Sequence, residues 1–437
     1  MDKEGKEGKE DQQRYLVTRS GPMLSTFERR GKGSTTITAL KSAMSMCWLF
    51  SLMSCLFLFR GLGDCSHELP VEIQSRSAVL MDGLTGQVIF EKNPEARLSP
   101  ASFVKMMTLC LAFDALKSGR AKPDQEVLVS EKAWKMGGSQ MFLKIGDKVP
   151  FIELLKGVAA ISANDGSVAI AEFLEGSEDA FVRKMNEKAK TLGLKNTHFV
   201  NSHGLFAENQ YTTAYDTAIL SFHYVKDHAD ALALHSILEF EYGGIKQQNW
   251  NRLLEMDERV DGLKTGYLSD AGYHIVVSAK EGEQRLIAVV MGVNTFLTRD
   301  QEALKLLEYG FKNFTTKAVA KRGEIIGKVE VQRGKLPDLD LSAEETVIVT
   351  VRKNNAEKIP IKMEIPQFVT APIMKGQPLG RLIVEQEGIP RKEINLVATA
   401  DVPTKSYVRF YQLGLLIVIG LLVLAVWRIR ALKKRRR

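Results

Sequence analysis

A serine and a lysine three residues apart are the first pair in this sequence whose side chains could do chemistry together. Ser102 is the only serine among the 437 residues that has a lysine, Lys105, three positions after it. On a helix this spacing places both side chains on one face. A serine hydroxyl becomes a nucleophile when a neighbouring base takes its proton, and burial lowers the proton affinity of a lysine. The pair therefore predicts a nucleophile beside its base.

The residues that follow Ser102 predict a buried helix that would position this pair. The stretch 103–113 is apolar almost all round, with Pro100 at its entrance and Gly119 at its exit. A helix without a polar face is typical of a protein interior. The alternative interpretation is that Ser102 only caps the helix and that Lys105 extends from the core to solvent.

Two further motifs favour the chemical interpretation. Ser162 and Asn164 stand between two helical stretches, and Lys264, Thr265 and Gly266 open a region with strand periodicity. Serine-x-x-lysine, serine-x-asparagine and lysine-threonine-glycine, in this order, form the signature of penicillin-recognising serine acyl-enzymes.

On these motifs the sequence resembles the low-molecular-mass penicillin-binding proteins, specifically the D-alanyl-D-alanine carboxypeptidases. The resemblance covers most of residues 70–405 and includes the stretches 138–144, 201–205 and 261–267. It implies a serine-type carboxypeptidase that removes the terminal D-alanine from peptidoglycan stem peptides and acts in cell wall biogenesis. It also implies covalent inhibition by β-lactams, and it implies no cofactor and no metal.

The resemblance assigns catalytic roles to Ser102, Lys105 and Ser162 and a substrate-binding role to Asn164. Ser102 would attack the peptide carbonyl while neutral Lys105 accepts its proton. Ser162 would relay a proton to the leaving amine, and Asn164 would hold the substrate and Lys105 in place.

The same resemblance assigns a substrate-binding set. Lys264 would supply positive potential, and Thr265 would donate a hydrogen bond to the terminal carboxylate of the substrate. Arg299 matches the position of the arginine that binds this carboxylate in the family. Gly266 and Tyr267 complete the set, and the backbone N–H groups of Tyr267 and of the nucleophile would form the oxyanion hole.

Three residues depart from the family pattern. Ala163 replaces a usual glycine, Ser202 replaces a common proline, and Tyr267 replaces a histidine of some members. None of these changes removes a catalytic group, so we expect them to affect rate and substrate preference.

Two other functions fit part of this pattern. A serine β-lactamase on the same fold is one alternative, but the additional β domain, the membrane anchor and the lack of a clear glutamate motif for deacylation argue against it. A penicillin-binding scaffold with little turnover is the other, although a scaffold has no need of Ser102, Lys105, Ser162 and Lys264.

The charge and hydropathy of the two ends predict an exported, membrane-anchored protein. The ends supply +3 and +7 of the net charge of +8, so the residues between them carry −2, which gives no support to nucleic-acid binding. Residues 43–59 form an uncharged run after a basic leader, as in a signal peptide or signal anchor. Residues 410–427 read as one membrane span with a cytoplasmic basic tail. The catalytic domain would then lie on the extracytoplasmic face of the cell membrane, periplasmic or outer.

The periodicity of the remaining sequence predicts an α+β fold. Residues 78–82 with 87–91, and 273–279 with 285–293, read as hairpins of one antiparallel sheet, with a helical insert between them and a closing helix at 301–314. Short strands between glycine and proline breaks, at 325–326, 347–351, 359–363, 382–385 and 394–399, predict a separate all-β domain. We expect this organisation: disordered basic leader 1–42, signal peptide or anchor 43–65, penicillin-binding peptidase domain 70–315, all-β domain 316–405, transmembrane helix 410–427 and basic cytoplasmic tail 428–437.

A few polar residues receive structural interpretations. His198 and His203 are interpreted as structural histidines, because no carboxylate stands at metal-ligand spacing from them. Asp165 and Glu172 are interpreted as solvated or capping side chains. Cys110 falls inside the buried helix, and the four cysteines form neither a disulfide framework nor a metal-spaced pair.

Overall fold

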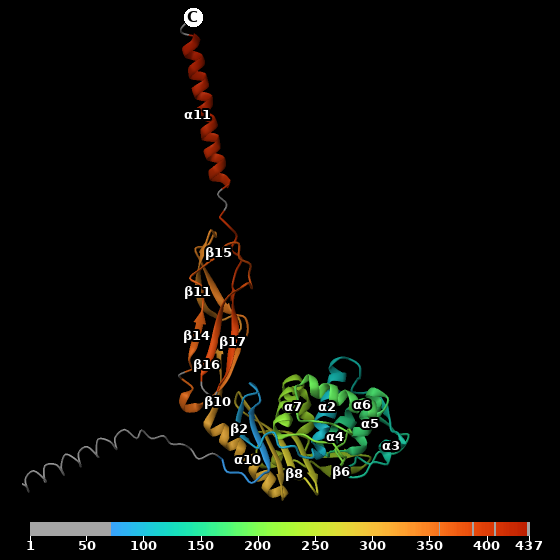
Figure 1. Cartoon of the computed structure of the whole chain (residues 1–437). Coiled ribbons are helices and arrows are strands. Elements are labelled where there is room, and N and C mark those ends of the chain that lie inside the picture. The colour runs from blue at the N-terminus through green and yellow to red at the C-terminus, as the bar shows by residue number, and fades with distance from the viewer. Residues whose placement is uncertain (1–70, 358, 387–388, 406–407, 435–437) are drawn as a thin grey trace, which may run out of the picture. The chain divides into compact units, whose positions relative to one another are not determined.

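The structure is a computed structural model that describes residues 71–357, 359–386, 389–405 and 408–434 (Figure 1). The predicted leader at 1–42 and the signal segment at 43–65 lie outside the described residues. The prediction of an α+β fold is confirmed by the observed elements.

A five-stranded antiparallel sheet forms the centre of residues 77–313. Its spatial order is β2-β1-β9-β8-β7, so strands from both ends of this region meet at the β1–β9 pair. Both predicted hairpins are present, and β8 and β9 each extend to ten residues. The strands are β1 (Ser77–Asp82), β2 (Val88–Lys92), β7 (Val260–Leu268), β8 (Gly272–Glu281) and β9 (Gln284–Val293).

Side chains of the central strands alternate between two hydrophobic cores. Val79 and Met81 belong to the core shared with the helical insert, whereas Leu80 between them belongs to the core shared with α10 (Phe296–Asn313). A strand sends successive side chains to opposite faces, so an apolar run is buried on both. Figure 1 accordingly shows the helices of the insert gathered on one side of the strands and α10 on the other.

The insert between β2 and β7 is mostly helical, as predicted. Its helices are η2 (Ala101–Phe103), α2 (Val104–Lys117), α3 (Glu131–Trp134), α4 (Phe151–Ala160), α5 (Asn164–Glu175), α6 (Glu178–Thr191), α7 (Ala214–Asp227), η3 (Ala229–Ala231), α8 (Leu232–His235) and α9 (Leu253–Met256). Two small ribbons interrupt them, β3 (Glu126–Leu128) with β4 (Lys148–Pro150) and β5 (Glu239–Tyr242) with β6 (Ile245–Gln248).

The closing helix begins earlier than the sequence predicted. We expected it at residue 301, but α10 starts at Phe296 because the hydroxyl of Thr295 accepts a hydrogen bond from the Thr298 N–H at 3.1 Å. This early start places Arg299 in the first turn of α10.

The described residues between 314 and 405 form strands and one 3₁₀ turn, which agrees with the predicted all-β region. Strand β10 (Phe314–Ala320) pairs with β13 (Val347–Arg352), and a six-stranded sheet has the order β14-β16-β17-β12-β11-β15. Two of its strands, β12 and β15, were not anticipated from the sequence. The other elements are β11 (Ile325–Gln332), β12 (Asp338–Ala343), η4 (Lys353–Asn355), β14 (Ile361–Glu364), β15 (Phe368–Thr370), β16 (Pro378–Gln386) and β17 (Ile389–Ala398).

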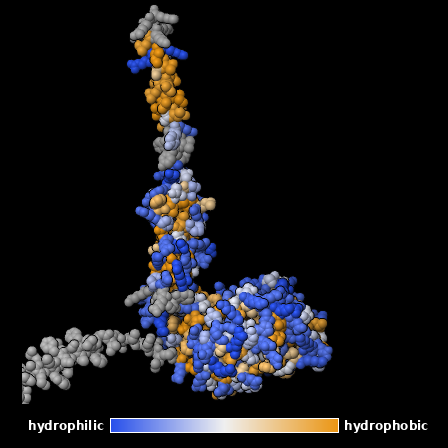
Figure 2. All heavy atoms as spheres, in the orientation of Figure 1, coloured by the Kyte–Doolittle hydropathy of each residue, from blue (hydrophilic) through white to orange (hydrophobic). Residues whose placement is uncertain are grey.

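The last helix, α11 (Val408–Lys434), is long and apolar enough to cross a membrane. Its segment Tyr411–Leu432 has 22 residues, a mean hydropathy of 2.3 and no burial against the rest of the chain. Figure 2 shows this stretch as a hydrophobic surface followed by hydrophilic residues.

Candidate active site

Ser102 lies in the 3₁₀ turn η2, which leads directly into α2. The N-cap residue of α2 is Phe103, and no side chain caps that helix. The capping interpretation of Ser102 is therefore wrong. The preceding residue, Ala101, has φ +49°, which bends the chain sharply before the nucleophile.

Lys105 points into the protein and ends at the Ser102 hydroxyl. Its side chain is fully buried, so the interpretation that it reaches solvent is also wrong. The Nζ atom lies 3.2 Å from Ser102 Oγ and donates a hydrogen bond of 2.7 Å to Asn164 Oδ1. It also donates to the backbone carbonyl of His203. The first distance is within reach for proton transfer.

The surroundings of Lys105 favour its neutral amine. Burial lowers the pKa of Lys105 well below its ordinary value, and the positive charge of Lys264 lowers it further, against a smaller opposing effect of Asp165. A neutral amine beside a hydroxyl can accept the hydroxyl proton, so the distance and the direction of the pKa shift both favour Lys105 as the base of Ser102.

Ser162 and Asn164 approach from the turn between α4 and α5. Ser162 has φ +63°, is nearly buried, and its Oγ has no hydrogen-bond partner among the described residues. The Asn164 N–H donates to Ser139 O at 2.7 Å, and its Nδ2 donates to Gly137 O at 2.6 Å. The backbone and the side chain of Asn164 are thus both held by hydrogen bonds. The Ser162 hydroxyl, by contrast, remains available to a ligand.

Strand β7 passes directly beside the nucleophile turn. A Cβ on Gly266 would lie 3.1 Å from Ala101 Cβ and 3.3 Å from the backbone nitrogen of Ser102, so a side chain at this position would push the strand away. The glycine of the lysine-threonine-glycine motif therefore permits the close approach of β7 to Ser102.

Positive charge and hydrogen-bond donors lie at the β7 edge of the sheet. They come from Lys264, Thr265 and Arg299. Lys264 is 2% exposed, its Nζ donates to Thr265 O at 3.1 Å, and burial, followed by the charge of Arg299, lowers the pKa of Lys264 to about 7. Arg299 is 5% exposed and pairs with Asp300 at 2.7 Å between Nη2 and Oδ1. Two cations at one buried edge are suited to an anionic group of a ligand.

The three departures from the family pattern fit the structure. Ala163 has φ −57°, so its backbone conformation needs no glycine. Ser202 is fully buried and hydrogen-bonded, and Tyr267 is exposed with its ring centroid 4.3 Å from that of Tyr273.

Asp165 is neither solvated nor capping, which corrects the sequence interpretation, since the residue is buried and the N-cap of α5 is Ala163, with no side-chain cap hydrogen bond. It is 1% exposed, and its carboxylate accepts backbone hydrogen bonds from Met141 and Leu143 at 3.1 Å each and from Gly166 at 2.8 Å. Asp165 therefore attaches the loop before α4 to the start of α5. Glu172, on the same helix, is half-buried and accepts from the Ser130 hydroxyl at 2.6 Å.

The loop 201–205 contributes a site residue that side-chain reasoning missed. Its Gly204 has φ +88°, and a Cβ there would lie 1.9 Å from Ala101 O. His203, one residue earlier, offers its backbone carbonyl to Lys105, and burial lowers the pKa of its imidazole to about 4. The one signal in the sequence was the asparagine-serine-histidine-glycine turn itself.

Cys110, Asp114 and His228 form a cluster of possible metal ligands, with one atom of each within 4.8 Å of the others. Asp114 already pairs with Lys188 at 2.8 Å and with His228 at 3.0 Å. Burial raises the pKa of the Cys110 thiol to about 12. These contacts satisfy the cluster within the protein.

The site as a whole can carry out acyl transfer. It brings together a hydroxyl beside a buried amine, a second hydroxyl with no partner among the described residues, and two basic side chains, from four separate segments of the chain.

The comparisons with known proteins agree with this chemistry. A family model described as D-alanyl-D-alanine carboxypeptidase matches residues 64–295, and one described as penicillin-binding protein 5, C-terminal domain, matches residues 314–404. The chain is 40% identical to D-alanyl-D-alanine carboxypeptidase DacF of Bacillus subtilis over 364 residues, which cover 80% of this chain and 91% of the relative. It is 36% identical to DacA of Escherichia coli over 344 residues, which cover 77% and 85%.

Two solved structures show the same fold. Penicillin-binding protein 5 from Haemophilus influenzae matches with a TM-score of 0.70 at 36% identity and covers 77% of this chain and 99% of its own. Penicillin-binding protein D2 from Listeria monocytogenes, in an ampicillin-bound form, matches with a TM-score of 0.51 at 26% identity and covers 56% and 99%.

The buried Lys264 generates a prediction about stability and pH. Its pKa is about 7 in the folded protein and about 10.5 in the unfolded chain, so between these values the unfolded chain binds more protons. Raising the pH in this window therefore stabilises the fold, by up to about 1.4 kcal/mol per pH unit. We expect Lys264→Met to be more stable than the wild type at pH 7, and this advantage to shrink toward pH 9.5.

Thermal unfolding of the full chain in detergent between pH 7 and 9.5 measures this difference. Lys280→Met, which removes an exposed lysine from β8, is the matched control and should differ from the wild type by the same amount at every pH. A pH-independent difference for Lys264→Met would contradict the lowered pKa.

Proposed function

Because the chain belongs to the D-alanyl-D-alanine carboxypeptidase family of serine peptidases, we propose that it removes the terminal D-alanine from peptidoglycan stem peptides through an acyl-enzyme on Ser102. The observation that carries this proposal is the distance of 3.2 Å between Ser102 Oγ and the Nζ of a fully buried Lys105. The cell-wall role follows from the substrate class of the family.

The acylation step uses the pair as nucleophile and base. Ser102 Oγ attacks the carbonyl of the penultimate D-alanine while Lys105 Nζ takes the hydroxyl proton. The negative charge on the carbonyl oxygen is stabilised by the backbone N–H groups of Ser102 and Tyr267. The proton passes through the Ser162 hydroxyl to the amine of the leaving D-alanine, the C–N bond breaks, and an ester on Ser102 remains.

Deacylation reverses these roles with water as the nucleophile. Water attacks the ester carbonyl, Lys105 accepts a proton from it, and Ser102 Oγ leaves and recovers its proton. The shortened peptide is released with a new carboxylate. The cycle consumes one water molecule and leaves the protein unchanged.

An exopeptidase must recognise the free carboxylate at the end of its substrate. Lys264, Thr265 and Arg299 supply two cations and a hydroxyl near the nucleophile, and Asn164 supplies an amide for the peptide backbone. The guanidinium of Arg299 uses Nε and Nη2 on Asp300, and its remaining donors suit a second carboxylate.

The same site would react with β-lactams, whose strained amide mimics the scissile bond and whose carboxylate mimics the substrate terminus. The ampicillin-bound relative supports this part of the proposal. Because the ring-opened product has no separate leaving group, the ester blocks the site until water removes it.

We further propose that α11 anchors the enzyme with its catalytic domain on the extracytoplasmic side of the cell membrane. The helix is followed by Arg435, Arg436 and Arg437, and basic residues after a span favour the cytoplasmic side.

Ser102→Ala is predicted to abolish release of D-alanine from a pentapeptide ending in D-Ala-D-Ala and covalent labelling by penicillin. Lys105→Ala should lower both by about 10²- to 10⁴-fold, because the hydroxyl then keeps its proton near neutral pH. Intact-protein mass spectrometry measures labelling, and a D-alanine assay measures release. Ser118→Ala, at the other end of α2, is the matched control and should retain both activities.

Each result of this experiment has a defined meaning. Covalent labelling of Ser102→Ala would contradict the assignment of the nucleophile. Rapid penicillin hydrolysis by the wild type with no D-alanine release would instead favour a β-lactamase. Labelling without turnover of either compound would favour a penicillin-binding scaffold.

Arg299→Ala is predicted to lower kcat/KM for the peptide by about 30- to 1000-fold, since a charge-assisted bidentate pair contributes about 2–4 kcal/mol. Penicillin labelling should fall less, because ring strain makes the β-lactam more reactive and Lys264 with Thr265 still binds its carboxylate. The variant leaves Asp300 buried without its cation. The double variant Arg299→Ala, Asp300→Ala removes that carboxylate and should keep the defect.

The steady-state kinetics of both variants test the assignment of Arg299. Wild-type kcat/KM in Arg299→Ala would show that selectivity comes from Lys264 and Thr265 alone. Full recovery in the double variant would show that the defect arose from the unpaired Asp300.

Protease added to intact spheroplasts is predicted to digest the catalytic domain and to spare an epitope fused after Arg437. Immunoblotting against each part measures this, with a cytoplasmic protein as the control for leakage. Protection of the catalytic domain in intact spheroplasts would contradict the proposed orientation.

A further inference from the structure

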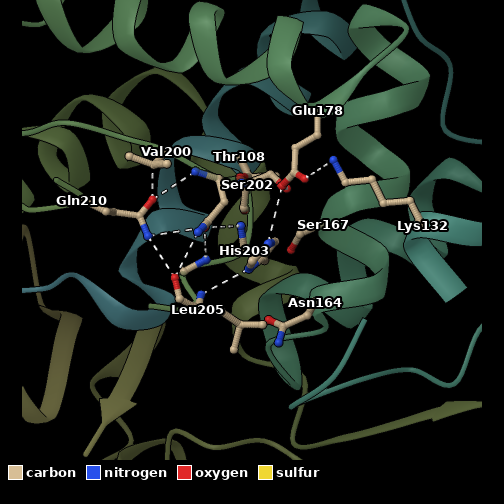
Figure 3. A network of polar contacts seen from close by, with 12 residues as sticks. Thr108, Lys132, Asn164, Ser167, Glu178, Val200, Ser202, His203, Leu205 and Gln210 are labelled. Carbon is tan, nitrogen blue, oxygen red and sulfur yellow. Dashed lines mark hydrogen bonds and ion pairs between the residues drawn. The ribbon is translucent and has the colours of Figure 1, made fainter. Parts of the chain in front are cut away.

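A buried carboxylate behind the catalytic lysine has no part in the mechanism above. Glu178 is 6% exposed and lies in the first turn of α6. Its Oε1 accepts hydrogen bonds from the backbone N–H of Ser202 at 2.9 Å and from the Ser202 hydroxyl at 2.6 Å. Its Oε2 pairs with Lys132 Nζ at 2.8 Å (Figure 3). Three donors therefore converge on one carboxylate.

Ser202, which Glu178 binds through its N–H and hydroxyl, and the next residue, His203, bind α2 through their carbonyls. The carbonyl of Ser202 accepts a hydrogen bond from the Thr108 hydroxyl at 2.7 Å, and the carbonyl of the next residue, His203, accepts from Lys105. Lys105 and Thr108 are three residues apart and share one face of α2. Two consecutive carbonyls thus bind the helix face that carries the base, and Glu178 binds the backbone N–H beside them.

The loop has little room to move. The His203 ring is 8% exposed, its Nδ1 accepts from the Leu205 N–H at 3.1 Å, and its Nε2 lies 3.6 Å from Glu178 Oε1. Gly204 leaves no space for a Cβ against Ala101 O. A displacement at Ser202 would consequently reach both the acceptor of Lys105 and the turn of the nucleophile.

A second set of contacts closes the outer side of this loop. The side-chain oxygen of Gln210 accepts from the N–H of Val200 at 2.9 Å and of Asn201 at 3.1 Å, and its amide donates to Leu205 O at 3.2 Å. Figure 3 shows Gln210 and Glu178 on opposite sides of the loop. Of these two contacts, the one with Glu178 is made at Ser202, beside the carbonyl that binds Lys105.

We propose that Glu178 is a positioning residue for acyl transfer, because it fixes through Ser202 the His203 carbonyl that holds the Lys105 amine against Ser102. This inference rests on the proposed function. Glu178 acts through the loop and does not touch the substrate.

Removing the Glu178 carboxylate should change the pKa of Lys105. The loss of a purely structural contact would not have this effect. In Glu178→Ala the N–H and hydroxyl of Ser202 lose their acceptor, and the loop can separate from α2 and admit water. Burial is the main cause of the lowered pKa of Lys105, so hydration raises that pKa. Of the other ionisable groups that face Lys105, Lys264 and Asp165 keep their contacts, whereas His203 loses the Glu178 charge that raises its pKa. More of the amine is then protonated at neutral pH and unable to act as a base.

The test measures acylation of the full-length protein in detergent by a fluorescent penicillin between pH 5 and 9, with the rate constant expressed per active site from the labelling amplitude. We expect Glu178→Ala to acylate about 10- to 100-fold more slowly per site, as a misplaced catalytic group does, with the acid limb of its pH profile moved to higher pH.

Two further variants separate positioning from loss of fold. Glu178→Gln keeps a side-chain oxygen for Ser202 and gives up only the pair with half-exposed Lys132, so it should stay within about threefold of the wild type. Glu172→Ala removes a half-buried carboxylate of α5 that binds Ser130 and not the loop, so its rate and pH profile should equal the wild type's. If Glu178→Ala does not fold, Glu178→Asp withdraws the carboxylate from Ser202 and should show the same slower rate and shifted acid limb.

The outcomes distinguish this inference from the proposed function. A wild type that forms no acyl-enzyme would overturn the function itself. A wild type that acylates, together with a Glu178→Ala or Glu178→Asp variant that has fewer active sites but an unchanged rate constant and acid limb, would overturn the positioning role alone. A Glu178→Gln variant as slow as Glu178→Ala would also overturn it, because the hydrogen bonds to Ser202 would then not be the cause.

Discussion

The burial of one amine without a carboxylate partner is the constraint on which the site depends. Lys105 Nζ contacts three oxygen atoms, those of the Ser102 hydroxyl, the Asn164 amide and the His203 carbonyl, and none of them carries a charge. A carboxylate in their place would hold the proton on Lys105 and end its use as a base. Neutral acceptors satisfy the N–H groups of the amine and still allow it to lose a proton.

The arrangement of neutral acceptors requires unusual backbone at three places. Ala101, Ser162 and Gly204 all have positive φ, and each lies within two residues of a group that contacts the amine. Residues other than glycine are strained in this region, so surrounding contacts must hold them. Asp165 and Glu178 supply such contacts through backbone N–H groups, which places the carboxylates of the site one step away from Lys105.

The sequence identified side chains that the structure brings together, but it did not identify the backbone groups that position them, for a physical reason. Ser102 and Lys105 are close together in the chain and can be recognised by their side-chain types. The apolar runs of β8 and β9 predict buried strands equally directly. The His203 carbonyl has no such signal, since every residue has a carbonyl. Asp165 looked like a solvated helix start because its partners, the N–H groups of residues 141 and 143, lie more than twenty positions earlier.

Outside the site, strand β12 and the early start of α10 were not predicted from the sequence, because the average character of each segment concealed them. Strand β12 contains Asp338 and Asp340, which alternate with buried Leu339 and Leu341, and its polar half hid the strand pattern. The early start of α10 depends on the cap at Thr295, and caps are set by one hydroxyl and not by periodicity. At the start of α10 a single local contact therefore overrides the average character of the segment.

The surroundings of Lys264 and Lys105 lower the pKa of each lysine and give the two lysines different proposed roles. Burial, followed by the charge of Arg299, lowers the pKa of Lys264 to about 7, and burial, followed by the charge of Lys264, lowers that of Lys105. A substrate carboxylate bound at Lys264, as proposed, would offset the repulsion from Arg299 and favour the charged form of Lys264. A charged Lys264 then disfavours a proton on Lys105. The carboxylate, which both the peptide and penicillin carry, also brings a negative charge of its own, so the lowered pKa of Lys105 depends mainly on burial, its largest cause.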